Sequence, residues 1–153
     1  MTADERYMSL ALALAREAGE AGDVPVGCVV VRDGVVVGRG RNRREADRDA
    51  TAHAEVEAIR DACRTLGRWR LHDCTLYVTL EPCPMCAGAI WNARLGRVVY
   101  GADDPAAGCC GSRLHLELEG FSPGAEITSG VLAADCRVLL RNFFAGLRRE
   151  GEI

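Results

Sequence analysis

Residues 82–86 read Pro-Cys-Pro-Met-Cys, and residues 53–55 upstream read His-Ala-Glu. Cys83 and Cys86 have the spacing that lets two thiolates bind one metal ion, and they lie at the start of a predicted helix. Of the three histidines, His53 is the best placed to be a third ligand. Two sulfurs and one nitrogen suit Zn²⁺, and three protein ligands leave the fourth position open, as in catalytic zinc sites. We therefore expect a catalytic Zn²⁺ site.

Glu55 follows the histidine by two residues and is placed to act on a water molecule bound to the metal. A purely structural zinc module is the competing interpretation. It requires a fourth protein ligand, for which His72, Cys74 and Cys109 are candidates. That interpretation leaves Glu55 without a role.

Length and composition set the frame for this site. The 153 residues are 48% hydrophobic and 27% charged, which predicts a single soluble domain spanning residues 1–153. No export signal or bilayer-length apolar run is visible, so we expect a cytoplasmic protein that does not bind a membrane. The net charge of −3 confines any nucleic-acid site to a local patch.

Eight cysteines in a chain without an export signal are expected to stay reduced. The vicinal pair Cys109-Cys110 has two interpretations that the sequence does not separate. The pair either fills a tight loop with small buried side chains, or has a redox or second metal role.

The hydrophobic pattern predicts an α/β domain with three α-β-α layers around a mixed, five-stranded central sheet. Asp33-Gly34 between two β-branched runs is a strong hairpin signal. A strand, a helix and a strand in succession then imply a parallel pair. The expected elements are helix 4–18, strands 26–32 and 35–39, polar loop 41–50, helix 53–66, strand 74–79, helix 83–94, strand 97–101, loop 103–112, short helix 113–119, edge strand 126–129 and helix 133–149.

The combination of His-x-Glu with Pro-Cys-x-x-Cys is a known signature of the zinc-dependent nucleobase deaminases. Residues 51–55 (TAHAE) and 79–89 (TLEPCPMCAGA) resemble the bacterial tRNA-specific adenosine deaminases of the cytidine/deoxycytidylate deaminase superfamily, and the similarity runs from about 24 to 111. The resemblance implies hydrolytic conversion of adenosine to inosine at the wobble position of a tRNA anticodon loop. It also implies a homodimer with an anticodon stem-loop as its partner.

The resemblance assigns roles to individual residues. Glu55 would be the catalytic acid and base, His53, Cys83 and Cys86 the zinc ligands, and Asn42 the residue that holds the base. Asp104 matches a position that contacts the RNA near the flipped nucleotide. The basic residues expected to contact RNA are Arg41, Arg43, Arg44, Arg148 and Arg149.

Some positions depart from the family pattern. Ala106 stands where many members carry lysine, and residues 121–125 (FSPGA) replace a polar, basic stretch. These departures fall on the expected RNA side and leave the zinc motif unchanged. A deaminase of a free base or small heterocycle such as guanine, built on the same zinc core, is therefore the alternative.

Overall fold

The computed structural model describes residues 1–120 and 124–150; part of the departing stretch 121–125 lies outside them. The described residues form five strands with helices on both sides, as the hydrophobic pattern predicted. None of the helices in these two ranges is long and apolar enough to cross a bilayer. The elements are α1 (Ala3–Glu20), β1 (Gly27–Arg32), β2 (Val35–Arg41), α2 (Arg44–Asp47), α3 (Ala54–Leu66), β3 (Thr75–Leu80), α4 (Pro84–Asn92), β4 (Arg97–Ala102), the 3-10 turn η1 (Leu116–Leu118), β5 (Glu126–Thr128) and α5 (Ala133–Glu150).

The predicted hairpin joins β1 to β2. Asp33 and Gly34 both have positive φ, 49° and 76°, as the type I′ turn between two-residue-linked strands requires. The sheet order is β2-β1-β3-β4-β5. β1 is antiparallel to β2 and β3, whereas β3, β4 and β5 are parallel, so the expected mixed sheet is confirmed.

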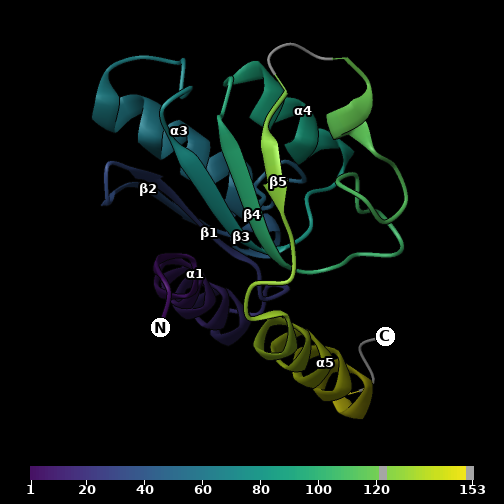
Figure 1. The fold of residues 1–153 in the computed structure, drawn as a ribbon. Coiled ribbons are helices and arrows are strands. Elements are labelled where there is room, and N and C mark those ends of the chain that lie inside the picture. Colours follow the sequence, from purple (N-terminus) through teal and green to yellow (C-terminus); the bar gives the residue numbers. More distant parts are fainter. Residues whose placement is uncertain (121–123, 151–153) are drawn as a thin grey trace.

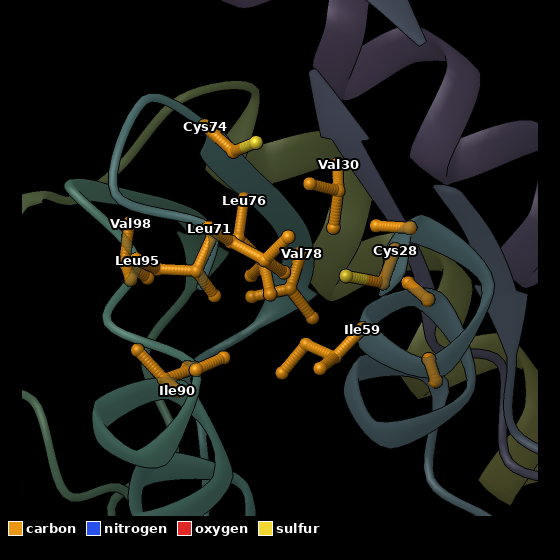
Figure 2. Packing of buried hydrophobic residues seen from close by; sticks show 14 of the residues in the cluster. Cys28, Val30, Ile59, Leu71, Cys74, Leu76, Val78, Ile90, Leu95 and Val98 are labelled. Atoms are coloured by element: carbon orange, nitrogen blue, oxygen red, sulfur yellow. The ribbon is translucent and has the colours of Figure 1, made fainter. Parts of the chain in front are cut away.

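The sheet separates two hydrophobic clusters, which gives the three layers. Figure 1 shows α1 and α5 on one face of the sheet and α3 and α4 on the other. Alternate strand residues point to opposite faces. Cys28, Val30, Leu76 and Val78 therefore pack toward α3 and α4 (Figure 2), while Val29 and its alternates pack toward α1 and α5.

Two glycines in β2 let α3 approach the sheet closely. A Cβ at Gly40 would lie 2.6 Å from the backbone nitrogen of Ala58, and one at Gly38 would lie 2.9 Å from that of Ala62. Any side chain at these positions would push α3 away. The close packing fixes the start of α3, where His53 and Glu55 lie.

The polar loop predicted for 41–50 is wrong in part, because α2 forms within it. The Asp23 carboxylate accepts hydrogen bonds from the backbone N–H groups of Glu45 and Ala46, at 2.7 and 3.2 Å. These are N–H groups that a short helix leaves without an internal partner. The cap comes from 22 residues away, so local sequence does not reveal it.

The short helix predicted for 113–119 is confirmed only in part. Only the 3-10 turn η1 forms there, and His115 pairs with Cys110 in an isolated antiparallel bridge. The N–H of Leu116 donates to the carbonyl of Cys109, and that of Ser112 to Glu81. The N–H groups of Leu118 and Glu119 donate to the carbonyls of His115 and Leu116, three residues earlier, so a 3-10 turn forms in place of an α-helix.

Candidate active site

Two helices point their N-terminal ends at one place. His53 is the N-cap residue of α3 and Cys83 is the N-cap residue of α4, and Cys86 lies in the first turn of α4. The side chain of His53 does not cap its own helix as a Ser or Asp would, and that of Cys83 bonds within α4 to Cys86, the other cysteine of the motif. The imidazole and the thiol are therefore available to a ligand.

The donor atoms of these three residues form one compact group. The Nδ1 atom of His53 lies 3.7 Å from the Sγ of Cys83 and 3.5 Å from the Sγ of Cys86. All three ligand atoms lie within 4.8 Å of one another, and no other His, Cys, Asp or Glu of residues 1–120 and 124–150 belongs to the group. One nitrogen and two sulfurs fit Zn²⁺ with a fourth position open. Within those two ranges, the fourth ligand that a closed structural site needs is not supplied.

Mutual hydrogen bonding sets the protonation of the group. The hydrogen bond from Cys86 lowers the pKa of Cys83 to about 4, and the same contact raises the pKa of Cys86. The bond to Cys83 raises the pKa of His53. One thiolate is thus already favoured at neutral pH, and a thiolate is the form that binds metal.

Glu55 lies beside this group, in the first turn of α3. Its side chain is 4% exposed. Burial raises the pKa of Glu55 to about 7, and a carboxyl group with a pKa near the working pH is suited to accept and return protons. Glu55 therefore has the chemistry of a general acid and base.

A cavity of about 200 Å³ opens in front of Glu55. It is smaller than the roughly 300–1,000 Å³ of pockets for drug-sized ligands, so it suits one small planar group. It brings together site residues that lie far apart in the sequence. Its lining is Val24, Val26, Asn42, Arg44, His53, Ala54, Glu55, Leu80, Glu81, Cys83, Asp104 and Ala107.

Asn42 is held in the cavity wall by its own amide. Its Nδ2 donates to the carbonyl of Val24, and its Oδ1 accepts from the N–H of Arg44, each at 3.2 Å. An amide has two donor hydrogens and an oxygen with two lone pairs. One donor and one acceptor site therefore remain for a ligand, which is what bidentate contact with the edge of a base requires.

The five arginines that were expected to contact RNA lie in different parts of the structure. Arg44 alone among the five lines the cavity. Arg41 donates to the carbonyl of Glu17, and Arg43 forms an ion pair with Asp47 at 3.0 Å. Arg148 and Arg149 lie exposed in the last turn of α5, outside the cavity lining.

Glu81 is a residue of the cavity wall that the sequence analysis missed. It is 2% exposed, and its carboxylate accepts from the N–H groups of Asp104, Cys110 and Ser112 at 3.0–3.1 Å. The only sequence signal is an acid at the end of a buried apolar strand. Cys109, 0% exposed, is buried and lies outside the metal-binding group.

A metal-binding group with an open position, beside a buried carboxylate in a base-sized cavity, defines a metal-dependent hydrolase. The model of the cytidine and deoxycytidylate deaminase zinc-binding region matches residues 1–102. The chain belongs to this family and is a zinc-dependent deaminase.

Comparison with individual relatives shows which deaminases of this family the chain is similar to. The chain is 48% identical to the tRNA-specific adenosine deaminase of Bacillus subtilis, over 98% of this chain and 94% of that protein. A structure from studies of A-to-I editing by tRNA:A34 deaminases is 44% identical, covers 88% of this chain and 99% of its own, and has a TM-score of 0.84. The chain thus belongs with the tRNA-specific adenosine deaminases.

The chain is also similar to enzymes named guanine deaminase. A guanine deaminase structure from Bacillus subtilis is 43% identical, covers 75% of this chain and 73% of its own, and has a TM-score of 0.64. A guanine deaminase from Nitrosomonas europaea covers 92% of this chain with a TM-score of 0.81, but only 27% of the residues are identical. The tRNA-specific adenosine deaminase of Bacillus subtilis combines 48% identity with 98% coverage of this chain.

Proposed function

We propose that this protein converts adenosine to inosine at the wobble position of a tRNA anticodon loop. The observation that carries the proposal is the near-full-length similarity to tRNA-specific adenosine deaminases. It is supported by the cavity, which is lined by both Asn42 and Glu55. Residues 1–153 would act as one deaminase domain. Its cytoplasmic location is part of the proposal, since tRNA is read there.

In this proposal His53, Cys83 and Cys86 hold the zinc ion. Zinc, when bound, lowers the pKa of a water molecule to near 7 and so supplies a nucleophile at neutral pH. Glu55 would carry both protons of that water in turn: the first to the ring nitrogen, which keeps it in inosine, and the second, from the newly added hydroxyl, to the departing amino group. A C6–O bond forms, the C6–N bond breaks and ammonia leaves.

The remaining residues bind the RNA. A loop base is splayed from its stack so that it enters the cavity. The free donor and acceptor of Asn42 hold its edge, and Asp104 lies at the wall of the same cavity. Arg44 supplies positive charge at the cavity.

Initial rates of ammonia release distinguish the two candidate substrates. Zinc-loaded protein is supplied with an anticodon stem-loop carrying adenosine at the wobble position or, in parallel, with free guanine. We expect turnover of the stem-loop and none of guanine. If guanine is turned over and the stem-loop is not, the protein is a deaminase of a free base, which is the alternative function.

Arg44→Glu is expected to weaken stem-loop binding and to reduce its dependence on salt. For single-stranded RNA, each phosphate that the protein no longer neutralises lowers the slope of log K against log salt by about 0.7. A salt titration of the dissociation constant measures this change. Arg64→Glu is the matched control, because that side chain is 71% exposed on α3 and does not line the cavity. Equal effects of the two changes would remove Arg44 from the RNA surface.

We also infer a homodimer formed through α3 and α4. Trp69 is 55% exposed and Met85 37% exposed at this side of the molecule. A hollow of about 390 Å³ beside Trp69 is lined mainly by apolar atoms of the two helices, including Val56 and Ile59. Exposed aromatic and Met side chains are enriched in protein interfaces. A second copy bound at this surface would contact α3 and α4, the helices whose N-terminal ends carry the metal-binding residues.

Trp69→Glu is expected to shift the protein from dimer to monomer. The change places a charge in the apolar centre of the inferred interface. Sedimentation velocity across a concentration series measures the state. Leu10→Glu is the control, since Leu10 is 43% exposed on α1, which covers the opposite face of the sheet (Figure 1). A variant that remains as dimeric as the wild type would place the interface elsewhere.

A further inference from the structure

We infer that Glu81 is a positioning residue for substrate: its carboxylate anchors the 104–112 loop and so sets one wall of the cavity. The inference rests on the proposed function only for the identity of the substrate. It begins from the burial of this side chain, which is 2% exposed at the end of β3. A carboxylate is rarely so buried unless its oxygens are bonded.

The bonds of Glu81 all go to the same loop. Oε1 accepts from the N–H of Asp104 at 3.1 Å and from the hydroxyl of Ser112. Oε2 accepts from the N–H groups of Cys110 and Ser112, each at 3.0 Å. These four donors, spread from one end of the 104–112 loop to the other, converge on one side chain. They tie both ends of the loop to the strand that precedes the zinc-binding cysteines.

The loop also closes sterically on this carboxylate. A Cβ at Gly108 would lie 2.5 Å from each oxygen of Glu81, so the backbone approaches more closely than a side chain would allow. Only glycine leaves that space. Buried contact and hydrogen bonding thus hold the loop in one place.

The anchored segment reaches the cavity. Asp104 and Ala107 both line it, together with Asn42. The Oδ1 of Asp104 accepts from the N–H groups of Ala106 and Ala107, which makes the turn one unit. Releasing Glu81 therefore moves the substrate-facing turn. The general base and the metal-binding group lie at the starts of α3 and α4, and the hydrogen bonds of the Glu81 carboxylate go to the loop and not to them.

Glu81→Gln tests this assignment. The amide has only one acceptor oxygen and presents N–H groups to N–H donors, so the loop loses part of its anchor. We expect unchanged zinc stoichiometry, faster hydrogen exchange at the Asp104, Cys110 and Ser112 amides, and a KM raised about tenfold with kcat within about threefold. Ser112→Ala, which removes one of the four donors, should shift KM in the same direction by less.

Asp73→Asn is the matched control. It also removes a carboxylate that accepts side-chain hydrogen bonds, here from Arg32 and Arg68, but lies outside the cavity lining. It should leave KM and the exchange of the 104–112 amides unchanged.

Two results would overturn the inference. Exchange that accelerates without a change in KM would show that the anchor does not reach the substrate. A fall in kcat at constant KM would place Glu81 in the chemical step. If Glu81→Gln does not fold, Ser112→Ala decides by the same criteria. KM is measured with whichever substrate the wild-type enzyme turns over. The role of Glu81 can therefore be tested even if the substrate is not tRNA.

Discussion

Glu55→Gln is expected to abolish deamination while zinc stays bound at the wild-type stoichiometry. The amide occupies the same volume in a position that is 4% exposed, so the fold and the metal-binding group keep their packing. It cannot take a proton from water or return it to the base. General acid–base catalysis contributes about 10²–10⁴-fold, so kcat should fall by at least about 10²-fold. Ammonia release and metal analysis of the same sample measure both quantities.

Glu57→Gln is the control for this change. It makes the same substitution two residues later on α3, at a position that does not line the cavity. Its kcat should match the wild type. A Glu55→Gln enzyme that retains wild-type turnover would remove the assigned acid and base and leave the mechanism without a proton carrier.

Cys86→Ala is expected to lower zinc content and stability together. The thiol is 0% exposed, and only His53 and Cys83 of the three-residue group would remain. Removing a residue that merely hydrogen-bonds a metal ligand costs roughly 10–100-fold in affinity, so removing a ligand should cost more than about 100-fold. Because bound metal stabilises only the folded state, the melting temperature should fall in zinc-containing buffer.

Cys74→Ala separates ligand loss from the loss of a buried sulfur. Cys74 is also buried, at 2% exposure, and lies outside the metal-binding group. It should keep full zinc content and lose a small amount of stability from its packing. Full zinc content in Cys86→Ala, or loss of zinc in Cys74→Ala, would mean that the ligand set is wrong.

The fold was largely predictable because its signals are local. The Asp33-Gly34 turn between β-branched runs predicted the hairpin, and the succession of strand, helix and strand predicted the parallel pair. Gly67 ends α3 with a φ of 68°. α2 was missed because its cap is the distant Asp23 carboxylate. In the segment 113–119 only a 3-10 turn forms, because its first amides donate to the carbonyls of Gly108 and Cys109 in the preceding loop.

The residues of the candidate site were likewise predictable only where their sequence signal is local. Spacing alone pointed to Cys83 and Cys86, whereas Asn42 and Asp104 came only from the family resemblance. Their places in the cavity wall depend on contacts with residues 18 and 23 positions earlier, the carbonyl of Val24 and the carboxylate of Glu81. Glu81 was missed because its partners are backbone groups 23–31 residues later.

The most direct test of the proposed activity is mass analysis of an anticodon stem-loop after incubation with the zinc-loaded protein. The stem-loop carries adenosine at the wobble position, and a second stem-loop carries guanosine there with adenosines elsewhere. We expect the first to gain the mass of amino-to-oxygen exchange at that nucleotide alone, and Glu55→Gln to leave it unchanged. An unmodified wobble adenosine, with the wild-type enzyme active on a free base, would contradict the proposed function.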